Sequence, residues 1–405
     1  MRILNLILVL AMPLSAQEAS VVLLAGSEIK SVKTSSDKVP NPELRLISKE
    51  GDQLYYIASV NKVTAKEISS RKVLWERQIE GQTLNSVFVS AEVVVVTSAD
   101  NYVFGLDKAT GKLLWSYGKI QPGLRAGNRE VTPKVAISAK TAYIAYDNSP
   151  DPETGKDTPY EVLVLHISLI DGEILWRKKL EGSEPLGMVF IPEQSCLAVI
   201  MRAYSNPDIP KKPGDRHNYG RMYFVNSQKG EIIKTWTSSF QTGLWNIQTA
   251  DKRLMVTAVT GDLFVFDIPT LRLLANVKLY SKNWTNMVDY PYLKICAGAK
   301  KIALWNAYET EIVNGKAMSL VQIRDVSDGK LLRLLRAPIS SGRILDVMCD
   351  SNIMRVVHSQ GITTWSSNGS AHTLEKRIDY VVDLSKEKTT VITDKGMEEV
   401  IFPSK

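Results

Sequence analysis

The residues best suited to binding chemistry gather in two polar stretches of the chain, 118–132 and 204–219. The second, YSNPDIPKKPGDRHNY, sets basic side chains between two tyrosines, and the first, GKIQPGLRAGNREVT, adds two arginines. Cations flanked by aromatic rings suit an acidic partner, a lipid headgroup or a peptide. A solvated, proline-rich connector is the alternative interpretation of 204–219. The candidate binding residues are Arg125, Arg129, Tyr204, Lys211, Lys212, Arg216, His217 and Tyr219.

Patterns typical of an enzyme do not accompany these stretches. The sequence has no Ser/His/Asp order of a hydrolase and no glycine-rich phosphate loop, and it contains only four histidines. Cys196, Cys296 and Cys349 are widely spaced, so we expect neither a zinc site nor a disulfide framework. Each lies in or beside an apolar run, which predicts buried free thiols. We therefore predict no catalytic residue, no metal and no cofactor.

The composition is that of a folded protein, and the first residues resemble an export signal. Of 405 residues, 44% are hydrophobic and 23% charged, and the net charge of +7 is spread along the chain, which does not indicate nucleic-acid binding. Residues 1–16 combine a basic start, a short apolar run and a small final residue, which predicts a signal peptide cleaved after Ala16. An uncleaved anchor or a buried first strand is the alternative. We expect residues 17–405 to form one exported domain, periplasmic or extracellular, with no transmembrane segment.

One phrase recurs along this domain. FGLDKATGKLLWSY (104–117) is an apolar run, a turn and a second apolar run that ends near a tryptophan, and LVLHISLIDGEILWRKKL (163–180) nearly repeats it. Five further turns follow the same pattern less closely, so that turn residues fall at 71, 111, 172, 230, 271, 329 and 369. The residues expected to dock one repeat on the next are Trp75, Asp107, Thr110, Gly111, Trp115, Gly172, Trp176, Gly230, Trp236, Gly329 and Gly369.

The shorter intervals between turns match the roughly 40–45 residues of a four-stranded propeller blade. Three strand-like runs follow the seventh turn, at 377–384, 389–395 and 397–402, and the run 19–26 stands alone near the N-terminus. We therefore predict an all-β, eight-bladed β-propeller of four-stranded antiparallel blades, whose last blade is closed by N- and C-terminal strands. Seven blades is the alternative.

The longer intervals predict loops. In this register the insertions at 147–160, 204–219 and 308–317 join the second and third strands of a blade, and 118–132 joins one blade to the next. All four would leave the same face of the propeller, and binding residues favour loops on a rigid scaffold.

The strand, Asp-x-x-Thr-Gly-Lys turn, strand and tryptophan seen at Asp107, Thr110, Gly111, Lys112 and Trp115 resemble the repeat of PQQ-type β-propellers. That resemblance implies a tryptophan that docks across neighbouring blades. The length and export signal are similar to the non-enzymatic, BamB-like branch, which implies a monomeric scaffold that binds a protein partner in envelope or outer-membrane protein assembly. Members of that branch are lipid-anchored, and no cysteine stands near the predicted cut.

The enzymatic branch of the family is the alternative. It implies a quinone beneath a vicinal disulfide and a calcium ion in the axial channel, and here no two cysteines adjoin. A periplasmic enzyme or small-ligand binder of that type remains the competing hypothesis.

Overall fold

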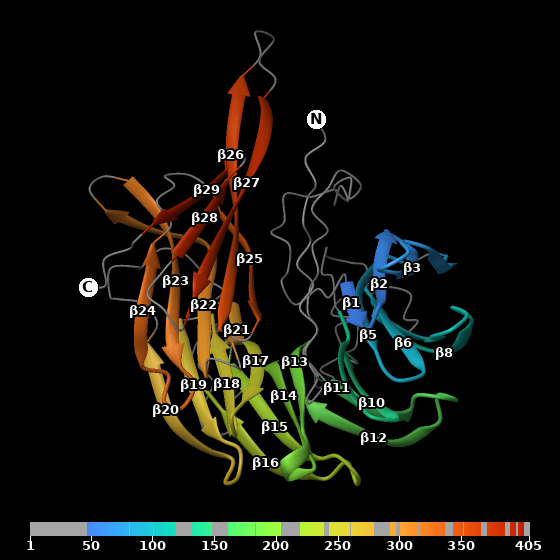
Figure 1. Ribbon diagram of the computed structural model, residues 1–405. Coiled ribbons are helices and arrows are strands. Elements are labelled where there is room, and N and C mark those ends of the chain that lie inside the picture. The colour runs from blue at the N-terminus through green and yellow to red at the C-terminus, as the bar shows by residue number, and fades with distance from the viewer. Residues whose placement is uncertain are drawn as a thin grey trace.

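The computed structural model consists almost wholly of antiparallel strands, and the described residues form seven sheets that follow one another around an arc (Figure 1). The all-β, multi-sheet prediction is confirmed. The structure describes residues 47–80, 82–99, 101–118, 132–147, 161–182, 184–203, 219–238, 243–259, 261–278, 292–296, 300–313, 316–336, 343–350, 352–365, 371–384, 389–393 and 396–400.

The first three sheets each hold four strands in chain order. Sheet 1 comprises β1 (Ile47–Glu50), β2 (Gln53–Ser59), β3 (Lys62–Glu67) and β4 (Val73–Gln78). Sheet 2 comprises β5 (Leu84–Val89), β6 (Val93–Ser98), β7 (Tyr102–Asp107) and β8 (Leu113–Gly118). Sheet 3 comprises β9 (Lys134–Ser138), β10 (Thr141–Asp147), β11 (Glu161–Ser168) and β12 (Ile174–Glu181).

The next three sheets repeat this order. Sheet 4 comprises β13 (Glu184–Ile191), β14 (Cys196–Ala203), β15 (Tyr219–Asn226) and β16 (Ile232–Thr237), with a 3₁₀ turn at Pro192–Gln194. Sheet 5 comprises β17 (Leu244–Ala250), β18 (Arg253–Ala258), β19 (Asp262–Asp267) and β20 (Arg272–Lys278). Sheet 6 comprises β21 (Tyr292–Cys296), β22 (Lys301–Val313), β23 (Lys316–Asp325) and β24 (Leu331–Arg336).

Sheet 7 has five strands: β25 (Arg343–Asp350), β26 (Ile353–Trp365), β27 (Ala371–Asp383), β28 (Thr389–Thr393) and β29 (Gly396–Val400). Its β26–β27 hairpin projects well beyond the other strands (Figure 1). Among the described residues, no helix is long and apolar enough to cross a membrane.

The hydrophobic core lies between the sheets, because strand side chains alternate between two faces and each face meets a different neighbour. In the VVVV run of β6, Val94 and Val96 pack with sheet 1, whereas Val93 and Val95 pack with sheet 3. All four are at most 1% exposed. This explains why apolar runs, rather than strict alternation, mark the inner strands of this sequence.

The predicted turn positions are confirmed in the first six sheets. The residues between the third and fourth strands have positive φ angles of 59° at Arg71, 70° at Gly111 and 75° at Gly172. The pattern continues with 71° at Gly230, 52° at Leu271 and 73° at Gly329. Glycine adopts this conformation without the steric cost that Arg71 and Leu271 carry.

Each of the first three sheets is fastened to the next by what we call the tryptophan latch. The indole Nε1 of Trp75, in β4, donates a hydrogen bond of 2.8 Å to the backbone carbonyl of Lys108 in sheet 2. The ring also lies against Gly111, where an added Cβ would come within 2.6 Å of it. The turn residue must therefore lack a side chain for the indole to reach the carbonyl three positions earlier.

The same latch recurs at two further junctions, where it involves the other two tryptophans expected to dock neighbouring repeats. Trp115 Nε1 donates to the Leu169 carbonyl at 2.7 Å and faces Gly172. Trp176 Nε1 donates to the Ser227 carbonyl at 2.9 Å, and an added Cβ at Gly230 would lie 2.9 Å from its ring.

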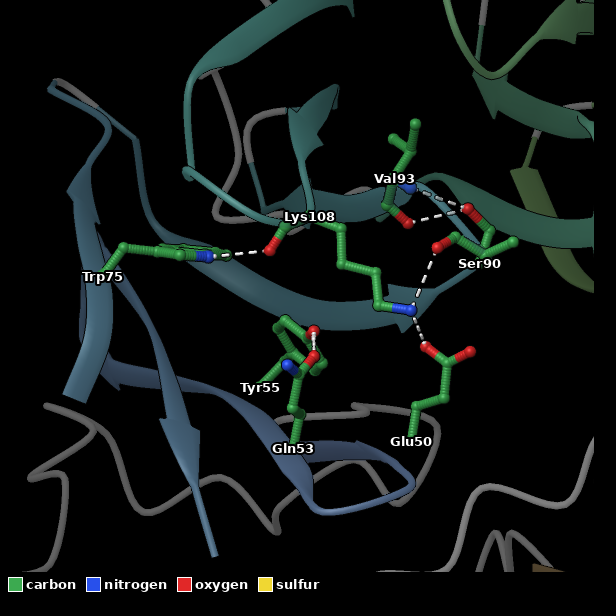
Figure 2. Close-up of polar contacts among 8 residues, drawn as sticks. Glu50, Gln53, Tyr55, Trp75, Ser90, Val93 and Lys108 are labelled. Atoms are coloured by element: carbon green, nitrogen blue, oxygen red, sulfur yellow. Dashed lines mark hydrogen bonds and ion pairs between the residues drawn. The ribbon is translucent and has the colours of Figure 1, made fainter. Parts of the chain in front are cut away.

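Figure 2 shows the first of these junctions, where Lys108 binds sheet 1 through both its backbone and its side chain. Its carbonyl accepts from Trp75, and its ammonium pairs with the Glu50 carboxylate in the β1–β2 turn. The same ammonium donates to the Ala91 carbonyl at 3.0 Å. One residue thus joins two turns and the neighbouring sheet.

The latch changes beyond sheet 4. At the position equivalent to the three tryptophans, β16 has Lys234, whose Nζ donates to the Leu271 carbonyl at 2.6 Å. Trp236, two residues later, packs edge-on against Phe264 and Phe266 of sheet 5, with ring centroids 4.9 and 5.1 Å away. The predicted docking of Trp236 is thus made by ring packing rather than by a latch.

Sheet 7 differs from the prediction. In every sheet, the backbone N–H of the residue after the third strand donates to a backbone carbonyl in the turn between the first and second strands. In sheet 7 this hydrogen bond runs from Leu384 to Asn352. The closing turn therefore follows Leu384, and the predicted closing turn at Gly369 is wrong. Gly369 itself lies outside the described residues, within the connection between β26 and β27.

The predicted eighth blade is not confirmed. The strand at 377–384 belongs to β27, which pairs with β26 along its whole length, and β28 is the fourth strand of sheet 7. The N-terminal run 19–26 and the signal peptide 1–16 lie outside the described residues. Seven sheets agree with the alternative prediction.

The cysteine prediction is wrong for two of three residues. Cys296 in β21 and Cys349 in β25 form a disulfide with their Cα atoms 5.1 Å apart. Cys196 is a free, fully buried thiol, as predicted, and burial raises its pKa to about 11. Sequence spacing did not reveal the pair because the first strands of sheets 6 and 7 meet only in the folded ring.

Gly172→Ala should destabilise the protein more than Gly51→Ala, by about 1–3 kcal/mol. Both glycines have positive φ, but a Cβ at Gly51 meets nothing within 4 Å, whereas one at Gly172 lies 2.7 Å from Trp115. Chemical denaturation of both variants measures the difference. If both variants lost the same free energy of unfolding, the latch would not require a glycine at position 172.

His166 should make stability fall as the pH drops below about 6.5. It is buried between Tyr143 and Trp176, with ring centroids 4.4 and 5.4 Å away, and burial lowers its pKa. Below that pH, His166 is protonated in the unfolded chain but stays neutral in the folded protein, which favours unfolding. The unfolding free energy at pH 7.5 and 5.5 should differ less in His166→Phe than in the natural protein; equal differences would contradict this.

Candidate functional site

The strands that flank the predicted binding loops lie where the sequence placed them. Residues 204–218 connect β14 to β15, and 119–131 connect β8 to β9, so both connections leave the same end of their sheets. Tyr219 is the first residue of β15 and stands opposite Ala203. The other candidates lie outside the described residues, and their binding role stays a prediction: Arg125, Arg129, Tyr204, Lys211, Lys212, Arg216 and His217.

The base of the 204–218 connection is an ionic cluster between sheets 3 and 4. Arg221 of β15, with a side chain only 4% exposed, pairs through Nη1 with Glu181 of β12 at 3.2 Å. Arg202 of β14 pairs with Glu184 of β13 at 3.7 Å. The hydroxyl of Tyr223 donates to the backbone carbonyl of Glu181 at 3.1 Å. Both strands that carry the loop are therefore held rigidly where the loop begins and ends.

Sequence reasoning missed this cluster. Its four charged residues are spread over four strands, and only the register that sets Met201 opposite Arg221 brings them to one end of the sheets. The signal available was Arg221, directly before the apolar run MYFV of β15, since a buried cation requires a partner.

A second exposed surface follows the outer rim. In each of the first six sheets, the pairing of the third and fourth strands skips one residue of the fourth strand, directly before the position of the latch tryptophan or its equivalent. Such a β-bulge breaks the alternation of faces, so two consecutive side chains point to solvent. The skipped residues are Leu74, Leu114, Leu175, Ile233, Leu274 and Leu332, all 38–52% exposed.

The residue before each of these is also aliphatic: Val73, Leu113, Ile174, Ile232, Leu273 and Leu331. Five of them are 37–47% exposed, whereas Ile174 is half-buried and packs against the apolar cluster between sheets 2 and 3. We call these six pairs the rim pairs. Exposed aliphatic side chains that recur at one place in a fold mark surfaces available for contacts with other molecules.

The charged residues of the repeated phrase have a local role. Oδ1 of Asp107 accepts from the Thr110 backbone N–H at 2.8 Å and from its hydroxyl at 2.5 Å. These hydrogen bonds lower the pKa of Asp107, and the bond from the Thr110 hydroxyl has the largest effect. Asp325 occupies the same turn position in sheet 6, and hydrogen bonds from Ser327 lower its pKa. In sheet 3 that position is Ser168, whose hydrogen bond to Asp171 lowers the pKa of that carboxyl group. The conspicuous Asp and Thr thus hold the turn that receives a latch.

Within the described ranges, no three His, Cys, Asp or Glu side chains are grouped so that they would hold a metal ion.

The seven sheets form an all-β, propeller-like array whose turns and tryptophan latches resemble those of PQQ-type repeats. A family model described as outer membrane protein assembly factor BamB matches residues 34–187, which confirms the resemblance to the BamB-like branch over that part of the chain. The chain is also 26% identical over 132 residues to the outer membrane protein assembly factor BamB of Moranella endobia (strain PCIT). That match covers 32% of this chain and 29% of the relative's length.

Two solved structures share the fold. Quinohemoprotein alcohol dehydrogenase from Comamonas testosteroni is similar with a TM-score of 0.55 and 12% identity, covering 87% of this chain and 71% of that one. The Dos1 propeller has a TM-score of 0.52 and 13% identity, with 75% of this chain and 72% of that one covered. At such identities the likeness concerns the fold alone.

Replacing Leu273 and Leu274 by Ser should change the free energy of unfolding by less than about 1 kcal/mol, because both are exposed in the native state. The neighbouring Leu263, fully buried, should cost about 3–5 kcal/mol when replaced by Ser. Chemical denaturation compares them. A large loss in the rim double variant would show that the rim pairs are part of the core instead.

Proposed function

We propose that this protein is an exported, non-catalytic β-propeller that acts as a protein-interaction scaffold in the assembly of outer-membrane proteins. The observation that carries the proposal is the match of residues 34–187 to the family of outer membrane protein assembly factor BamB. The chain works on the periplasmic side of the envelope, associates with the assembly complex peripherally, and is itself monomeric.

The construction of the fold supports a scaffold. Neighbouring sheets share apolar clusters, and in sheets 1 to 4 a side chain of the outer strand also bonds to the next sheet, so the loops at either end have fixed starting points. At the base of the 204–218 connection, Arg202 of β14 and Arg221 of β15 form ion pairs with neighbouring strands. The basic residues of this connection then meet an acidic surface of the partner with little loss of backbone entropy.

The test is affinity capture of the tagged mature protein from envelopes of its native host, in parallel with a charge-matched pair of variants. The first variant replaces Lys211, Lys212 and Arg216 by Ala. The control replaces Lys140, Lys229 and Lys252, which are exposed in turns at the opposite end of the sheets. We expect the natural protein and the control to recover an outer-membrane assembly protein, and the first variant to recover at least about tenfold less.

Equal recovery by both variants would remove the 204–218 loop from the interface. A mature protein that recovers no assembly protein but retains a quinone or calcium ion would instead support the enzymatic alternative. Mass spectrometry of the captured material and of the protein's own bound small molecules distinguishes these outcomes.

A further inference from the structure

The contacts between neighbouring sheets change in kind along the chain. The position occupied by Trp75, Trp115 and Trp176 in sheets 1 to 3 is taken by Lys234, Ala275 and Arg333 in sheets 4 to 6. The junction of sheets 5 and 6 combines a shared apolar cluster with polar contacts of inner strands, such as the 2.8 Å bond from Gln248 to the Leu293 carbonyl. The tryptophan latch is thus confined to the first half of the ring.

At the junction of sheets 6 and 7, the backbone carbonyl equivalent to the latch acceptor receives a hydrogen bond from a lysine instead of an indole. The Leu384 carbonyl stands where the carbonyls of Lys108, Leu169 and Ser227 receive their indoles, and it accepts from the Lys301 ammonium instead. Lys301 pairs in register with Cys296, at the end of β21. The disulfide from Cys296 to Cys349 therefore lies at the junction where a lysine has replaced the latch tryptophan.

Several features mark this disulfide as a connection between sheets. Its cysteines lie in the first, inner strands of sheets 6 and 7, 53 residues apart, and Cys296 is 1% exposed. Beyond Cys349 the chain forms the rest of sheet 7, including the projecting β26–β27 hairpin and the fifth strand β29 (Figure 1). A covalent bond here fixes the whole C-terminal sheet to the body of the propeller.

We propose that the Cys296–Cys349 disulfide replaces the tryptophan latch at the last junction, so that attachment of sheet 7 depends on oxidation after export. The inference goes beyond the scaffold function and rests on it only for the exported location. It adds a redox requirement: in a reducing compartment the two thiols stay free, and sheet 7 is held by non-covalent contacts alone.

The bond forms by thiol–disulfide exchange with an oxidant of the dithiol/disulfide class. One cysteine thiolate attacks the oxidant's disulfide, which gives a mixed disulfide and releases one thiolate of the oxidant. The second cysteine thiolate then attacks the sulfur of the first, which forms the intramolecular bond and releases the oxidant as a dithiol. The protein loses two electrons and two protons, and the oxidant takes up both electrons and both protons as it becomes a dithiol.

The third cysteine does not compete in this exchange. Cys196 is fully buried in sheet 4, and burial raises the pKa of its thiol to about 11, which leaves little thiolate to react. It is therefore the matched control: a cysteine of the same chain in a sheet junction without a disulfide.

The test compares the full chain in oxidised and reduced form with the variants Cys296→Ser/Cys349→Ser and Cys196→Ser. Mass spectrometry first establishes whether the protein from an oxidising compartment lacks two protons relative to its reduced form. Hydrogen exchange then follows peptides from β25 to β28 separately from peptides of β5 to β16. We expect exchange in β25 to β28 to rise at least about tenfold on reduction and in the double variant, with β5 to β16 unchanged.

Cys196→Ser should leave exchange in β25 to β28 at the level of the oxidised natural protein. Free thiols at both positions after oxidative expression would overturn the proposal, as would equal exchange in oxidised and reduced protein. If the double variant fails to fold, reduction of the folded natural protein still decides the question. Partner capture by the oxidised protein is scored separately, so a failed scaffold function and a failed redox requirement are distinguishable.

Discussion

The first four sheets of the arc are joined by one recurring contact: an indole that fills the space where a Cβ would otherwise stand. At Gly111, Gly172 and Gly230 an added Cβ would lie less than 3 Å from the preceding sheet's tryptophan. The contact needs a glycine and a tryptophan in different repeats, so neither residue can change alone. This mutual requirement explains why the phrase is clearest in the first half of the chain, where all three pairs are complete.

Where the pair is lost, each junction uses different chemistry. Sheets 4 and 5 are joined by a hydrogen bond from a lysine ammonium, and sheets 5 and 6 by hydrogen bonds of a side-chain amide. Sheets 6 and 7 are joined by a disulfide and a second lysine. These substitutes differ in range and in sensitivity to their surroundings, because ion–dipole bonds weaken in water whereas a disulfide responds only to redox conditions. The two halves of the propeller are therefore stabilised by interactions of different kinds.

The sequence predicted the fold class and six of the seven turns because a positive φ at a fixed distance from an outer strand usually leaves a visible Gly. It misplaced the last turn because Asn368 and Gly369 resemble a closing turn but lie between β26 and β27, while the true turn after Leu384 contains no glycine. The disulfide and the ionic cluster at Arg221 were missed for a related reason. Both join strands whose meeting is decided by ring geometry, which no local pattern encodes.

The main-chain bond between the first and last turns of every sheet has a consequence for how such chains diverge. It joins Ile68 to Asp52 in the first sheet and Leu384 to Asn352 in the last, and its donors and acceptors are backbone atoms of unlike residues. Any residue except proline can supply the donor, so substitutions accumulate at these turns without opening the sheet. Proteins of 12–13% identity can thus keep one architecture. The sequence motif of a repeat can be lost by substitution while the four-stranded sheet that it encoded is retained.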